Sequence, residues 1–380
     1  FDQCSSIDAL EARMHRLHED IADYTAVKDS IRTGFEDEAR IRERRERIMA
    51  ALGATEKDWQ DYRWQLANRI TTADELQRHL TLTPEAARQV ETVAEKYRFA
   101  ISPYYLSLID PDNPACPIRR QAIPALPEMD PAGELDPMDE AGSTPVNGIT
   151  RRYPDRLIIK VTNQCGMYCR FCQRRRLIGE QDRHTSPDVL EQALTYIREH
   201  LEIRDILLTG GDALMLSDTR LDWLLSELRA IAHVEIIRIG SRTPVTLPQR
   251  ITPALVKILR KYHPLFFNTH FNSPAEITPE ARIACERLAD AGIPLGNQMV
   301  LLNGVNNDKF VVRKLNQQLL RIRVKPYYIF HAKQVRGTSH FWVKLEEGLE
   351  IMESLRGYTS GLAIPTYIVN GTGGLGKTPL

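Results

Sequence analysis

The stretch RLIIKVTNQCGMYCRFC, residues 156–172, joins a short apolar run to three closely spaced cysteines. Its first seven residues, 156–162, have the length and the β-branched composition of a buried strand. From here to the end of the chain, short apolar runs alternate with amphipathic stretches of helical period. Further strands are predicted near 205–209, 235–239, 265–270, 295–302, 326–330 and 364–369, and helices near 187–200, 217–231, 252–262, 278–291, 309–322 and 346–356.

This alternation predicts an α/β fold in which parallel strands are joined by helical crossovers. The best match is a partial, open barrel of the (β/α)6 type, with six to seven strands and a TIM-like arrangement, over residues 151–380. In such folds the chemistry gathers at the C-terminal ends of the strands. The three cysteines directly follow the first strand, so they are expected at that end of the barrel.

Two segments precede the predicted barrel. Residues 1–102 are charge-rich and are predicted to form an N-terminal helical segment, with helices near 37–52 and 76–97. Residues 103–150 contain nine of the 22 prolines. This composition predicts an extended connector without regular structure, which would wrap over another surface or subunit because it is long for a loop within one domain.

The composition limits the possible partners and compartment. Lys+Arg and Asp+Glu are both 50 among 380 residues, so neither a nucleic acid nor a membrane surface is indicated. No apolar run approaches the roughly 18 residues that span a bilayer. Three of the six cysteines fall within eight residues, which is unlike a disulfide framework and is typical of a metal site in a reducing cytoplasm.

Cys165, Cys169 and Cys172 form a compact set of potential thiolate ligands. Structural zinc sites usually take four ligands. A cubic iron–sulfur cluster held by only three cysteines keeps one iron free for a small molecule. The sequence therefore favours a 4Fe-4S cluster with an open iron; the alternative is a zinc site completed by a distant ligand such as His184.

The segment GTGGLGKT, residues 371–378, matches the phosphate-loop pattern G-x4-G-K-[ST] and follows a predicted strand. A phosphate loop must open into a helix whose N-terminus faces the phosphates. Pro379 and Leu380 follow instead, so nucleotide binding is kept only as the alternative. The favoured interpretation is that Lys377, on a flexible glycine loop above the barrel, binds pyridoxal 5′-phosphate (PLP) covalently.

The C-x3-C-x2-C motif after a first barrel strand resembles radical S-adenosylmethionine (SAM) enzymes. In that superfamily the open iron chelates SAM, and one electron from the cluster cleaves it to a 5′-deoxyadenosyl radical. The resemblance implies a low-potential electron donor such as flavodoxin or ferredoxin. Gly210, Gly211 and Asp212 resemble the superfamily's motif that meets the methionine amino group.

The glycine loop at the end of such a barrel resembles the lysine 2,3-aminomutase family, in which PLP holds an amino group that moves between adjacent carbons. The matching segments are 152–156, 165–176, 208–214, 238–244, 247–253, 268–271 and 294–298. Members of this family form dimers or tetramers through their N-terminal helices, so the resemblance implies a homo-oligomer, either a dimer or a tetramer.

The resemblance also implies which residues bind the cofactors and the substrate. Lys377 would carry PLP; Arg152, Tyr153 and Arg156 would hold its phosphate, which suits guanidinium groups. Arg174 would bind the substrate α-carboxylate through two hydrogen bonds; a solvated basic cluster at 174–176 is the alternative. His270 and Gln298 would contact SAM, although a purely structural role is the alternative for both.

The substrate is indicated by two departures from the lysine enzyme. That enzyme grips the substrate ε-ammonium with two aspartates, and this chain has Lys333 and Asn370 at those positions. Lysine would place an ammonium beside an ammonium, whereas a side-chain carboxylate could pair with Lys333 and accept a hydrogen bond from Asn370. We therefore expect interconversion of L-glutamate and β-glutamate; lysine, aspartate or another amino acid is the alternative.

A third departure concerns zinc. The lysine enzyme binds a structural zinc partly through cysteines beyond its lysine loop, whereas this chain ends at Leu380 and has Asn306-Asn-Asp308 in the barrel loop. No such zinc is predicted. Two other classes of protein are the alternatives: an RNA-modifying radical enzyme, which would have no use for Lys377, and an iron–sulfur electron carrier, which would need a fourth cysteine.

Overall fold

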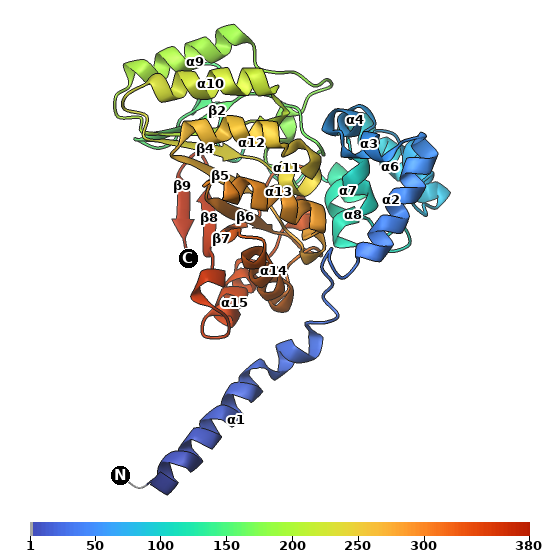
Figure 1. Cartoon of the computed structure of the whole chain (residues 1–380). Helices are drawn as coiled ribbons and strands as arrows, with labels where there is room; N and C mark the ends of the chain where they lie inside the picture. Colours follow the sequence, from blue (N-terminus) through green and yellow to red (C-terminus); the bar gives the residue numbers. More distant parts are fainter. Residues whose placement is uncertain (1–2) are drawn as a thin grey trace.

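The computed structural model describes residues 3–380, and its centre is one curled nine-stranded sheet (Figure 1). The strand order follows the chain from β1 to β9, and β2 to β8 are parallel. The strands are β1 Ile149–Thr150, β2 Arg156–Lys160, β3 Asp205–Thr209, β4 Ile236–Gly240, β5 Leu265–Thr269, β6 Leu295–Leu301, β7 Lys325–His331, β8 Thr366–Gly371 and β9 Gly376–Pro379. The predicted open α/β barrel is confirmed, with seven parallel strands.

Helices cover the outer face of this sheet (Figure 1). They are α9 Pro187–Glu199, α10 Asp218–Ala230, α12 Pro253–Leu259, α13 Pro279–Asp290, α14 Lys309–Arg321 and α15 Leu345–Leu355. Alternation along the strands separates the two faces. In β2, for example, Leu157 and Ile159 are buried against the helices, whereas Ile158 and Lys160 line an inner cavity.

The N-terminal segment is helical, as predicted. Its helices are α1 Gln3–Val27, α2 Glu38–Leu52, α3 Glu56–Gln60, α4 Tyr62–Ala67, α5 Ala73–Gln77 and α6 Pro84–Lys96. The predicted helix at 76–97 is divided, because Thr83 caps a new helix by accepting a hydrogen bond from the Ala86 amide. In Figure 1, α1 extends away from the rest of the molecule.

The prediction that 103–150 lacks regular structure is wrong for residues 103–129, whereas residues 130–148 contain no helix or strand. The segment contains the helices α7 Pro103–Ser107 and α8 Pro117–Ala122 and the 3-10 turn η1 Leu126–Met129. Proline stands at the first position of both helices, where its fixed φ is favourable and no backbone donor is lost. Every residue of α7 is buried, and α7 packs against α2 and against α11 (Thr243–Thr246) of the barrel. The connector therefore joins the N-terminal helices to the barrel.

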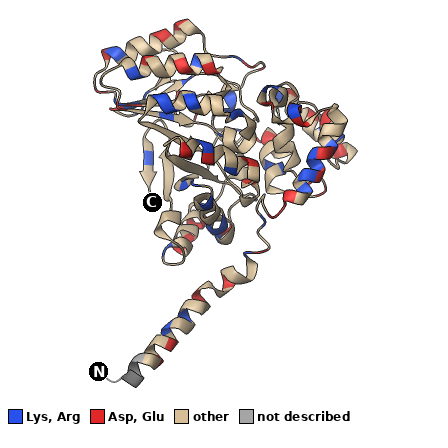
Figure 2. Ribbon diagram, viewed as in Figure 1, with Lys and Arg blue, Asp and Glu red and all other residues tan. Residues whose placement is uncertain are grey.

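Charged residues of both signs are spread over the outer helices in the view of Figure 2, consistent with the zero net charge. Among residues 3–380, no helix has the length and the apolar composition needed to cross a membrane.

Candidate active site

A cavity of about 320 Å3 opens at the C-terminal ends of the parallel strands. All predicted site residues except Tyr153 and Arg156 line it. They are Cys165, Cys169, Cys172, Arg152, Arg174, Gly210, Gly211, Asp212, His270, Gln298, Lys333, Asn370 and Lys377. Residues from seven strands and their loops thus meet as the fold class predicts.

The three cysteines lie in the loop that follows β2, and the connector holds this loop in place. The Tyr168 amide donates to the Ala100 carbonyl at 3.0 Å, and the Arg170 amide donates to the Gln121 carbonyl at 2.9 Å. The buried Arg170 guanidinium pairs with the buried Glu128 carboxylate at 2.6 Å. The connector, together with Ala100 just before it, therefore fixes the backbone between the cysteines, a role that its composition did not reveal.

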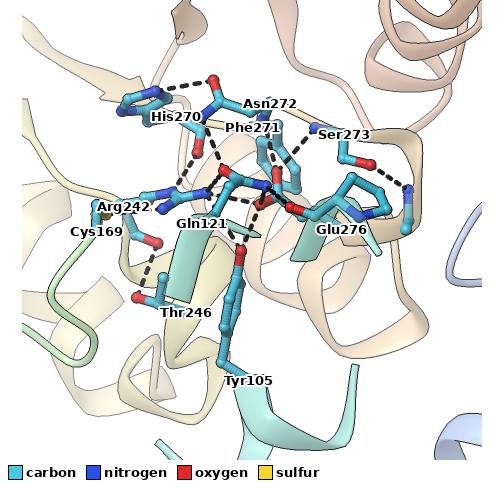
Figure 3. Close-up of polar contacts among 12 residues, drawn as sticks. Tyr105, Gln121, Cys169, Arg242, Thr246, His270, Phe271, Asn272, Ser273 and Glu276 are labelled. Carbon is cyan, nitrogen blue, oxygen red and sulfur yellow. Dashed lines mark hydrogen bonds and ion pairs between the residues drawn. The ribbon is translucent and has the colours of Figure 1, made fainter. Parts of the chain in front are cut away.

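Arg242, directly after β4, donates a hydrogen bond from Nη1 to the Cys169 sulfur at 2.8 Å (Figure 3). Its Nη2 donates to Glu276 Oε1 and to Gln121 Oε1, both at 2.7 Å. Tyr105 also donates to Glu276 Oε1, at 2.7 Å. A buried cation held against a ligand sulfur stabilises a thiolate and adjusts the potential of a bound cluster.

The donor set fits an iron–sulfur cluster. Burial raises the pKa of Cys165 and Cys172, and the positive charge of a bound metal would favour the thiolate form of both. Within residues 3–380, no three His, Cys, Asp or Glu side chains converge on a position for a single ion. His184, the extra ligand of the zinc alternative, contacts Thr162 Oγ1 at 3.0 Å and does not line the cavity.

The turn Gly210-Gly211-Asp212 packs against the cysteine loop. A Cβ on Gly210, whose φ is +131°, would lie 2.4 Å from the Thr162 carbonyl oxygen, so this position requires glycine. The Asp212 carboxylate accepts hydrogen bonds from Ser241 Oγ at 2.7 Å and from the Arg242 amide at 2.8 Å. We therefore expect Asp212 to fix the turn, with the backbone of the turn facing the cofactor.

The two predicted SAM contacts both line the cavity. His270 Nε2 bonds Asn272 Oδ1 at 3.0 Å, and the imidazole packs edge-on against Phe171. Burial and the charge of Arg242 lower the pKa of His270 to about 3, so it is neutral at physiological pH. Gln298 follows an irregularity in β6. A contact with SAM stays a prediction for both residues.

Lys377 lies on a β-hairpin, directly opposite Asn370. The glycine-rich loop turns the chain from β8 into β9 and opens no helix, so it lacks the geometry of a phosphate loop. The Lys377 amide donates to the Tyr153 hydroxyl at 3.1 Å. Gly376, at φ +90°, lies beside the same hydroxyl, 3.2 Å from an added Cβ. Tyr153 therefore supports the hairpin from outside the cavity.

The Lys377 ammonium lies over the rings of Tyr328 and Phe330, at 4.7 and 5.1 Å. Burial, with the charges of Arg238, Arg156 and Arg152, lowers the pKa of Lys377 to about 8. A lysine with such a pKa is substantially neutral near pH 8, and only the neutral amine attacks an aldehyde. The Arg156 guanidinium stacks on the Tyr153 ring at 3.9 Å.

Lys333 and Asn370 present donors to the same cavity as Lys377. The Lys333 ammonium donates to Gln173 Oε1. Burial, followed by the charges of Arg174 and Arg152, lowers the pKa of Lys333 to about 7. Asn370 Nδ2 is buried without a hydrogen-bond partner among the described residues. A buried amide without a partner is costly, so a ligand acceptor is expected there.

Arg174, predicted to bind a substrate carboxylate, pairs with Glu140 of the connector, which was not among the predicted site residues. Lys160 of β2 was also missed and lines the cavity. An inward position on a barrel strand could have identified Lys160. No local pattern distinguishes Glu140 from the other acids of the connector.

Comparisons with known proteins identify the family to which this chain is related. Residues 159–312 match the Radical SAM superfamily. Glutamate 2,3-aminomutase of Clostridioides difficile (strain 630) is 56% identical over 369 residues, covering 97% of this chain and 87% of that protein. L-lysine 2,3-aminomutase of Acetoanaerobium sticklandii is 51% identical over 328 residues, which cover 86% of this chain and 79% of that protein.

A radical SAM methyltransferase structure from Sphaerobacter thermophilus aligns with a TM-score of 0.45 and 15% identity, over 58% of this chain and 68% of that one. Family membership rests on the sequence relatives, whose lengths this chain largely covers. The chain therefore belongs to the family of radical S-adenosylmethionine 2,3-aminomutases, isomerases that use a 4Fe-4S cluster and SAM.

Proposed function

We propose that this enzyme is PLP-dependent and interconverts L-glutamate and β-glutamate. One observation carries the proposal: an ammonium, Lys333, and an unpartnered amide donor, Asn370, share a cavity with Lys377. Together they complement a carboxylate, because one supplies charge and the other a directed hydrogen bond. Asn370 is the cross-strand neighbour of Lys377, so a ligand held on Lys377 would extend past it.

The charge of the cavity supports the same substrate. Six cationic side chains line it, whereas Asp212 is its one carboxylate among the described lining residues. These cations are Arg152, Lys160, Arg174, Arg242, Lys333 and Lys377. PLP phosphate and the two carboxylates of glutamate would meet this excess of positive charge. A lysine side chain would bring a further ammonium to Lys333, and like charges in a partly dry site repel strongly.

Each residue would have a separate task. When bound, PLP holds the amino group of the substrate, while the cluster with SAM and a one-electron reductant supplies the radical that removes a hydrogen atom. Arg152 and Arg156 would neutralise the PLP phosphate. Arg174 would bind the α-carboxylate, and Lys333 with Asn370 the side-chain carboxylate. The name of the Clostridioides difficile relative, glutamate 2,3-aminomutase, agrees with this proposal.

The proposal is tested by anaerobic incubation of the reduced holoenzyme with 13C-labelled L-glutamate, L-lysine or L-aspartate, followed by NMR. We expect labelled β-glutamate from glutamate and little or no product from the other two. Label that appears only in β-lysine would show that the substrate assignment is wrong. A product from aspartate would show that chain length is not selected.

The oligomer proposed for this enzyme is supported by α1. Ile7, Leu10, Met14, Leu17 and Ile21 are all at least 40% exposed, and their spacing of three and four residues forms one heptad stripe. Such a stripe pairs with another helix in coiled coils. The base of α1 is fixed to α14, where the Tyr24 hydroxyl donates to Gln317 at 2.6 Å. We propose that the stripe packs against a second copy of the chain.

Leu10→Glu combined with Leu17→Glu is expected to reduce the molar mass in solution, because both substitutions place charge within the stripe. Size-exclusion chromatography with light scattering measures this mass. Ala12→Glu, on the opposite side of the helix, is the matched control and should keep the mass of the wild type. A monomeric wild type, or an unchanged mass in the double variant, would contradict the proposal.

A further inference from the structure

Glu140 lies between two arginines of the active site. Its carboxylate is only 4% exposed and faces the Arg174 guanidinium. Arg174 Nε lies 3.0 Å from both carboxylate oxygens, and Arg174 Nη2 lies 2.8 Å from Oε1. Arg152 Nη2 approaches the same oxygen at 3.4 Å. The connector thus places one acid against two cations, Arg152 and Arg174, that line the cavity.

The backbone that carries Glu140 is firmly attached. Residues 136–144 form a compact turn, in which the Ala141 amide donates to Asp136 Oδ2 at 3.0 Å. The Pro137 carbonyl of the same turn accepts a hydrogen bond from the Gly373 amide at 3.1 Å. Gly373 belongs to the loop that presents Lys377. One turn therefore contacts the hairpin that carries Lys377 and also, through Glu140, the Arg174 guanidinium.

Glu140 occupies one edge of the Arg174 guanidinium, the edge formed by Nε and Nη2. Nη1 has no hydrogen-bond partner among the described residues, and Arg174 lines the cavity. A guanidinium has five donors in a planar fork, so it can bind a second carboxylate while the first holds it in place.

We propose that Glu140 is a positioning residue that holds Arg174 with its Nη1 side directed to the α-carboxylate of the amino-acid substrate. The inference rests on the proposed role of Arg174 in substrate binding and extends it to a residue of the connector. Burial opposes the ionisation of Glu140, but the hydrogen bonds and charge of Arg174 outweigh burial and lower the pKa of Glu140 to about 2. Glu140 is therefore anionic throughout the working pH range.

Two effects of Glu140 on substrate binding have opposite signs. As a charge, Glu140 repels a nearby carboxylate, so its removal would tighten binding. A Glu140 that merely occupied the substrate's place on Arg174 would give the same result. As a positioning residue, Glu140 keeps a long and flexible side chain in one geometry, so its removal must weaken binding. The direction of the change therefore distinguishes these roles.

The test is isothermal titration calorimetry of PLP-loaded holoenzyme, without reductant, with L-glutamate and with L-lysine. Glu140→Gln keeps the shape of the side chain but loses its charge and one acceptor oxygen. We expect Kd to rise about tenfold for whichever of the two amino acids binds, because both carry an α-carboxylate. In turnover assays KM should rise more than kcat falls. An unchanged or lower Kd would overturn the proposal.

Two further variants complete the test. Glu140→Asp keeps the charge and should recover part of the affinity, and it also serves if the glutamine variant is unstable. Glu134→Gln, in the same connector, is the matched control, because the Glu134 side chain makes no ion pair with any described residue. Lys333→Met should weaken binding of glutamate but not of lysine. If the wild type binds lysine alone, the substrate assignment fails while the effect of Glu140 remains measurable.

Discussion

Lys377→Ala will remove the absorbance band of lysine-bound PLP and abolish detectable aminomutase activity. Lys377 lies in the cavity on the β8–β9 hairpin, and its pKa of about 8 supplies a neutral amine for covalent attachment. Burial is the main cause of this low pKa. The neutral fraction of Lys377 therefore increases as pH rises through about 8. The rate at which apoenzyme takes up PLP, followed by absorbance, should rise over the same range.

The matched control is Lys333→Met, which removes the other low-pKa lysine of the cavity. With a pKa of about 7, Lys333 would be the better nucleophile on ionisation alone. Its ammonium, however, is held by Gln173, whereas Lys377 lies among Arg152, Arg156 and Arg238, which suit a phosphate. Lys333→Met should keep the PLP band. A band lost in Lys333→Met and kept in Lys377→Ala would reverse the assignment.

The barrel could be predicted because parallel strands covered by helices are nearly continuous apolar runs, as in β3 and β4. The connector helices could not, because α7 and α8 are short and begin with proline, a residue that also marks loops. The strand β9 was missed for a different reason. Its four residues carry no apolar alternation, and its pairing depends on the preceding glycine turn.

The site could be predicted where its residues belong to a local motif. The cysteines and the Gly210-Gly211 pair lie in loops that follow predicted strands, and Lys377 ends a glycine-rich motif. Glu140 and Arg242 act through long-range pairs, 34 residues from Arg174 and 73 residues from Cys169, respectively. Such partners depend on how the connector and β4 meet the cysteine loop, which no local pattern encodes.

Combining Lys333→Asp with Asn370→Asp should shift the preference from glutamate toward lysine. The change replaces one cation and one neutral donor with two anions at the position proposed for the substrate side chain. Opposite and like charges in a partly dry pocket differ by several kcal/mol, so the ratio of kcat/KM for glutamate over lysine should fall on the order of 100-fold or more. Competition between the two labelled amino acids, read by NMR, measures this ratio directly.

A control variant tests whether the effect depends on where the charge is changed in the molecule. Lys325→Asp makes the same substitution as Lys333→Asp, but at the exposed far end of β7, and should leave the selectivity unchanged. In the wild type, Lys333 keeps its proton below its pKa of about 7, so glutamate should bind best below this pH and more weakly as pH rises through it. A bound carboxylate raises this pKa, so the midpoint in the complex will lie higher. Selectivity that survives the double aspartate change would place the substrate carboxylate elsewhere in the cavity, with Lys160 as the next cation to test.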